Sequence, residues 1–169
     1  MLPAWILDAF AAVMLAVAAV SAARAAAARP WRRGGTAVGT DVAHLLMAIA
    51  MIGMLTGSLR AIPVVAWESA LSVLMAWFVF RAGRDVRTRG LRALPGAHLL
   101  HCAAMLYMFL AAAQQPSRYP ALAYAFALAL AGYAVWDLDR LSAGRPSVVT
   151  AGCRTAMGVT MAFMLIAMA

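Results

Sequence analysis

The sequence predicts an all-α, polytopic transmembrane helix bundle of about six helices, with both termini outside the cytoplasm. Hydrophobic residues make up 66% of the 169 residues and charged residues only 12%. In a typical soluble domain, roughly half of the residues are apolar and roughly a quarter are charged. One soluble core of this size cannot bury that excess, so lipid must solvate much of it. The apolar residues also form continuous runs, whereas the strands of a membrane barrel alternate over ~10 residues. We therefore expect a single transmembrane domain over residues 1–169.

Six apolar runs define the expected helices. They cover residues 2–23, 41–59, 62–80, 96–113, 121–136 and 155–169. Each has roughly 15 to 22 residues, close to the ~20 that a helix needs to cross the hydrocarbon layer. A cleaved signal peptide would carry basic residues before its apolar stretch. Here the first basic residue is Arg24, after the stretch, so we expect the first helix to be retained.

Arginine placement predicts the orientation. The chain has no lysine, and 12 of its 14 arginines lie in the first, third and fifth loops, with only Arg60 and Arg118 on the opposite side. Loops on the cytoplasmic side of a membrane protein are enriched in positive charge. We therefore expect these three loops to lie on the cytoplasmic side of the plasma membrane. The net charge of +8 then reflects topology and contact with anionic lipid headgroups. It gives no reason to expect a nucleic-acid partner.

Methionine recurs on one face of three of the runs, and in two of them histidine heads the row. In the second run, one histidine and three methionines are separated by three, four and three residues. In the fourth run, two histidines and two methionines repeat this spacing, and a cysteine follows the second histidine. These candidate metal ligands are His44, Met47, Met51 and Met54, and His98, His101, Cys102, Met105 and Met108. The last run adds Cys153, Met157, Met161, Met164 and Met168. At ~100° per residue, each stripe keeps to one side of its helix, and the three helices run in the same direction.

Thioether, thiolate and imidazole are the ligands that select Cu(I). Thioethers are uncharged, so they line a path through lipid without the cost of buried carboxylates, and successive weak sites let an ion enter and leave. The sequence thus predicts Cu(I) binding, transfer or export. We expect His44, His98, His101 and Cys102 to form an inner site, with the second and fourth helices packed together and their histidines at one level.

Two other functions remain open. The protein could be a b-type haem electron carrier, with His44 opposite His98 or His101 as axial ligands. It could also be a non-catalytic subunit of a membrane complex or homo-oligomer, with methionine as a flexible packing residue. No nucleotide loop, zinc-binding helix or serine elbow occurs in the sequence, so an enzyme is the less favoured class.

The few acidic residues have simpler interpretations. Asp41 precedes His44 by three residues and is expected to cap the second helix, or else to orient the His44 ring. Asp137 and Asp139, next to Arg140, are expected in a solvated network at the inner end of the fifth helix.

The stretches 41–54 and 98–108 together resemble a family of small actinobacterial membrane proteins, catalogued as domain of unknown function 5134. The resemblance covers most of the chain. It implies a multi-pass membrane fold and brings no established activity.

The arginine distribution gives a topology that reporter fusions can test. Fusions at Gly34 and Gly90 should report a cytoplasmic location, because they lie within the Arg-rich loops, and a fusion after Ala169 should report an external one. A cytoplasmic carboxyl terminus would show that the number of membrane spans is wrong.

Overall fold

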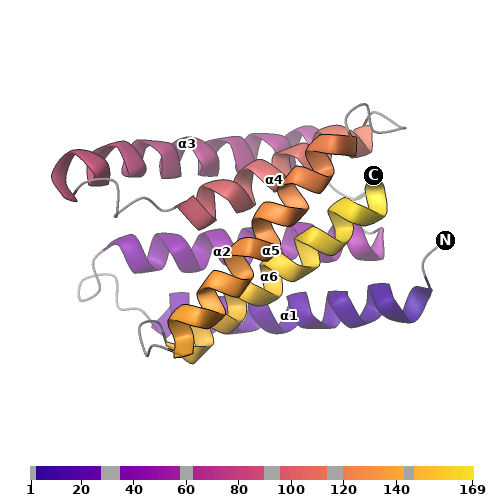
Figure 1. Ribbon diagram of the computed structural model, residues 1–169, viewed down its shortest axis with the longest axis horizontal. Helices are drawn as coiled ribbons and strands as arrows, with labels where there is room; N and C mark the ends of the chain where they lie inside the picture. Colours follow the sequence, from indigo (N-terminus) through magenta and orange to yellow (C-terminus); the bar gives the residue numbers. More distant parts are fainter. Residues whose placement is uncertain (1–2, 28–34, 58–62, 90–95, 114–119, 143–146) are drawn as a thin grey trace. The chain divides into compact units, whose positions relative to one another are not determined.

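The computed structural model describes residues 3–27, 35–57, 63–89, 96–113, 120–142 and 147–169. These residues form six α-helices and, within these ranges, no strand (Figure 1). The helices are α1 (Ala4–Ala27), α2 (Gly35–Thr56), α3 (Val64–Arg89), α4 (Gly96–Ala113), α5 (Pro120–Ser142) and α6 (Val148–Met168). All but α4 are long and apolar enough to cross a membrane. At 18 residues, α4 spans about 27 Å, close to the ~30 Å hydrocarbon layer. The predicted all-α membrane fold is confirmed.

The helices extend beyond several of the apolar runs. Only α4 has the predicted bounds; α5 continues past Trp136, and α6 begins seven residues before Thr155. The N-cap of α6 is Ser147, whose hydroxyl oxygen accepts a hydrogen bond from the Thr150 backbone N–H at 3.3 Å. Such a cap satisfies one of the unpaired N–H groups at the helix start. The added turns of α5 and α6 hold charged residues, which apolar runs exclude.

Two compact units make up the chain, Met1–Pro63 and Val64–Ala169. In the first, α1 packs against α2, and Arg24 Nε lies 3.2 Å from Asp41 Oδ1. The expectation that Asp41 caps the second helix is wrong, because α2 begins six residues earlier, at Gly35. Its buried carboxylate instead forms an ion pair with Arg24 of α1. Such a pair offsets the cost of burying an acidic group between apolar helices.

The second unit contains α3 to α6. Here α5 packs against α6, and α4 contacts both of them as well as α3. Since the connections from α4 to α5 and from α5 to α6 are short, each helix runs opposite to the one before it, and α4 and α6 run in the same direction (Figure 1). Two ring contacts hold α4 against α3: Trp67 with Phe109, and Phe78 with His98.

A buried ion pair joins α5 to α6. The Arg154 Nη2 atom donates to Asp137 Oδ1 at 2.7 Å, and the Asp137 side chain is 7% exposed. The expected solvated network is therefore wrong for Asp137, whereas Asp139 is exposed. The Asp137–Arg154 pair repeats the 17-residue separation of the Arg24–Asp41 pair with the charges reversed. Asp137 lies before the last turn of α5 and Arg154 beyond the first turn of α6, so the helix dipoles contribute little to the pair.

Breaking this pair should destabilise the protein. Asp137→Ala leaves the mostly buried Arg154 charge uncompensated, and we expect a loss of about 2–3 kcal/mol in the free energy of unfolding. Exchanging the two residues, Asp137→Arg with Arg154→Asp, restores a pair of opposite charges between the same two helices. Thermal unfolding of the purified protein, followed by circular dichroism, should therefore show a higher midpoint for the exchange than for Asp137→Ala. A midpoint no higher than that of the single variant would refute the pairing.

Candidate metal site

His101 is a buried residue of α4 whose ring orientation is fixed by the backbone. It is 6% exposed, and its Nδ1 atom lies 2.5 Å from the carbonyl oxygen of Ala97. Because a carbonyl oxygen can only accept, Nδ1 carries the proton, and Nε2 of the neutral ring keeps its lone pair. Proteins use this carbonyl contact to set the tautomer of a metal-binding histidine.

The free end of the His101 ring points at a glycine of α6. A Cβ atom built on Gly158 would lie 3.7 Å from His101 Nε2 and 3.6 Å from the carbonyl oxygen of Leu130, with no other ring atom of His101 within 4 Å. Nε2 has no hydrogen-bond partner of ordinary geometry among the described residues, although the ring makes a weaker hydrogen bond with the backbone of Arg154. A nitrogen lone pair and a carbonyl oxygen thus face the space that Gly158 leaves.

Three buried methionines lie within about one turn of this contact along the two helices. Met105 follows His101 by one turn of α4, while Met157 and Met161 flank Gly158 on α6; all three are fully buried. Since α4 and α6 run in the same direction, Met105 and Met161 both lie about one turn, ~5–6 Å, beyond the His101–Gly158 contact. One imidazole and three buried thioethers therefore lie within about one turn of this contact along α4 and α6.

The other candidate metal ligands of α4 do not all face the same neighbouring helix. The His98 ring stacks on Phe78 of α3, with 5.1 Å between the ring centroids, while the His101 ring faces α6. Cys102 is a fully buried free thiol, and Met108 is fully buried farther along the stripe. Among the residues that the structure describes, no three His, Cys, Asp or Glu side chains are grouped to hold a metal ion. A site here would depend on methionine.

The α2 stripe belongs to the first unit. His44 is 5% exposed, Met47 and Met51 are fully buried, and Met54 is half-buried. These side chains therefore avoid the surface, as a ligand stripe or a packing face would require. The predicted approach of His44 to His98 or His101 joins the two units and stays a prediction.

Sequence reasoning missed Gly158 and the Leu130 carbonyl. A backbone carbonyl carries no sequence signal, and a glycine in an apolar helix is typical of close helix packing. The available signal was position, because Gly158 lies between Met157 and Met161 on the α6 stripe. Two further buried polar atoms lie near the start of that stripe, Arg154 Nε and Thr155 Oγ1, and neither has a hydrogen-bond partner among the described residues.

Comparison with known families identifies the family of most of the chain. Residues 36–168, from α2 to α6, match the family described as "Domain of unknown function (DUF5134)". The chain belongs to the DUF5134 family. The resemblance to this domain family seen in the sequence is confirmed, and the match includes all three methionine stripes. No curated protein and no solved structure matches the chain.

The Ala97 contact predicts a single tautomer for His101. Nitrogen-15 NMR of histidine-labelled protein should show His101 protonated at Nδ1 and bare at Nε2, because the carbonyl oxygen accepts only from Nδ1–H. The signal is assigned by its loss in His101→Gln and its retention in His98→Gln. A bare Nδ1 with a protonated Nε2 would contradict the described geometry.

Proposed function

We propose that this DUF5134 protein binds Cu(I) within the cytoplasmic membrane, between α4 and α6, and takes part in copper transfer or export. One observation carries the proposal: the buried His101 Nε2 points at the space beside Gly158 while Ala97 holds the other ring nitrogen. In this proposal His101 is the nitrogen ligand, and Met105, Met157 and Met161 supply thioether sulfur.

The ligand chemistry favours a soft, monovalent ion. Imidazole and thioether select Cu(I), whereas Mg, Ca and Mn require several oxygen ligands. The four proposed ligands are neutral, and the neighbouring charges of Asp137 and Arg154 cancel in their ion pair. A bound Cu(I) then adds one uncompensated charge to a low-dielectric region, and a divalent ion would add two at a far higher cost.

The α2 stripe carries the same ligand chemistry within the first unit. His44, Met47, Met51 and Met54 repeat the imidazole and thioether ligands over ~15 Å of helix. A series of weak sites allows an ion to move without becoming trapped. This is what supports transfer or export over simple storage.

Copper content of variants tests the proposal. After anaerobic loading with Cu(I) and removal of free metal, wild-type protein should retain copper and His101→Ala should retain none. Gly158→Ala is the sharper variant, because its methyl group would sit at ordinary contact distance from Nε2 yet intrude where an ion ~2 Å from that nitrogen must lie. We expect Gly158→Ala to lose at least about tenfold in Cu(I) affinity, roughly 1.4 kcal/mol, with an unchanged unfolding temperature.

A matched pair of methionine variants separates coordination from packing. Met105→Leu removes a proposed ligand, and Met14→Leu makes the same change at a fully buried methionine of α1 outside the stripes. Both should cost less than ~1.5 kcal/mol in stability, but only Met105→Leu should lower copper retention. Equal copper in all variants would refute the site, and an intense Soret band in the purified protein would favour haem b instead.

A further inference from the structure

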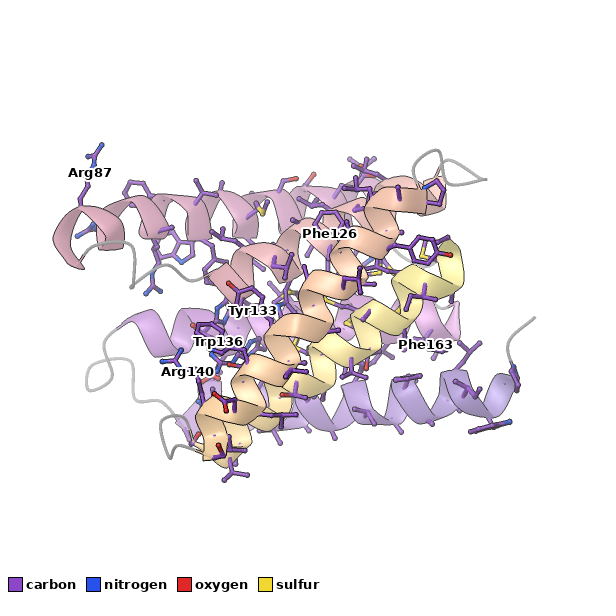
Figure 2. All side chains as sticks on the ribbon, in the orientation of Figure 1. Arg87, Phe126, Tyr133, Trp136, Arg140 and Phe163 are labelled. Atoms are coloured by element: carbon purple, nitrogen blue, oxygen red, sulfur yellow. The ribbon has the colours of Figure 1, made fainter. Side chains whose placement is uncertain are left out.

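An aromatic and cationic face lies at the end of α5, apart from the metal site. Tyr133, Trp136 and Arg140 are spaced by three and four residues, which places them on one side of the helix. Figure 2 shows these side chains following one another along α5. Trp136 is 50% exposed and the nearby Val135 and Leu138 are also exposed, so this part of the helix surface faces the surroundings of the protein.

Contacts within the second unit hold this face in place. The Tyr133 hydroxyl lies against Gly96, the first residue of α4, where a Cβ atom would come within 2.5 Å of it. The Tyr133 ring meets the Trp136 ring edge-on, with 5.6 Å between centroids. Arg140 Cζ then lies 4.9 Å from the centroid of the Trp136 ring. The indole thus supports the guanidinium through a cation–π contact, which leaves the guanidinium N–H groups available.

Arg140 makes no salt bridge with a described residue. The two described salt bridges are Arg24–Asp41 and Asp137–Arg154, so Asp137, one turn before Arg140, is already paired with another arginine. Arg140 therefore presents an uncompensated charge beside an exposed indole, at the end of a membrane-crossing helix. A membrane offers one abundant group of complementary charge at that depth, the lipid phosphate.

We infer that Tyr133, Trp136 and Arg140 form a binding site for the phosphate of an anionic phospholipid. A guanidinium fork binds phosphate oxygens in a bidentate manner, and tryptophan favours the headgroup level of the membrane. Anionic lipid is concentrated in the cytoplasmic leaflet, which the arginine distribution assigns to this end of α5. The site is independent of the proposed copper function.

Lipid retention in native mass spectrometry tests the site, with phosphatidylglycerol as the anionic probe and phosphatidylcholine as the zwitterionic one. Wild-type protein should bind phosphatidylglycerol about tenfold more tightly than Arg140→Gln does, since a charge-assisted contact is lost. The matched control is Arg87→Gln, which removes an exposed arginine of α3 without a described aromatic ring beneath it. It should bind phosphatidylglycerol as wild type does.

Thermal unfolding in detergent provides a second measurement that does not depend on lipid surviving ionisation. Without lipid, wild type and Arg140→Gln should unfold at the same temperature. Added phosphatidylglycerol should raise the unfolding temperature of wild type and of Arg87→Gln more than that of Arg140→Gln. Equal binding of both lipids by wild type, or equal loss in the two arginine variants, would overturn the inference and leave only diffuse surface attraction.

Discussion

Buried between α5 and α6, the Asp137 carboxylate and the Arg154 guanidinium can stay charged only if they stay together, and their 2.7 Å contact joins the two helices in one register. That register also fixes the positions of the polar groups near the start of α6. Arg154 lies one turn before Gly158, so the same contact sets the level at which Gly158 meets His101 and the Leu130 carbonyl.

The fold class followed from composition, because lipid must solvate apolar surface that no core can hold. The bounds of α4 also followed directly, since its run contains no charge. The ends of α5 and α6 did not, because hydropathy treats Asp137 and Arg154 as breaks although a neutralised pair can lie inside helices. The prediction for Asp41 was wrong for the same reason, because its charge is also neutralised by a partner on another helix. A carboxylate near an expected helix start suggests a cap, and only the packing of α1 on α2 revealed Arg24 as its partner.

At the candidate site, helical periodicity was enough to predict which side chains turn inward, and His101, Met105, Met157 and Met161 are all buried. Periodicity could not separate His98 from His101, because the two share a stripe. Their difference arises from neighbours on other helices, Phe78 for one and Gly158 for the other. Nor could it identify the hydrogen bond from His101 to Ala97, since every helical histidine has a carbonyl four residues before it and only the side-chain rotamer decides the contact.

The coordination shell itself gives the most direct test of the central claim that the α4–α6 interface is a soft-metal site. X-ray absorption at the copper K-edge, on anaerobically loaded protein, separates light nitrogen or oxygen neighbours from heavier, more distant sulfur. The account predicts Cu(I) with one imidazole nitrogen and at least two sulfur neighbours, and loss of the imidazole signal in His101→Ala. A shell of nitrogen and oxygen alone, or a spectrum unchanged by His101→Ala, would contradict it.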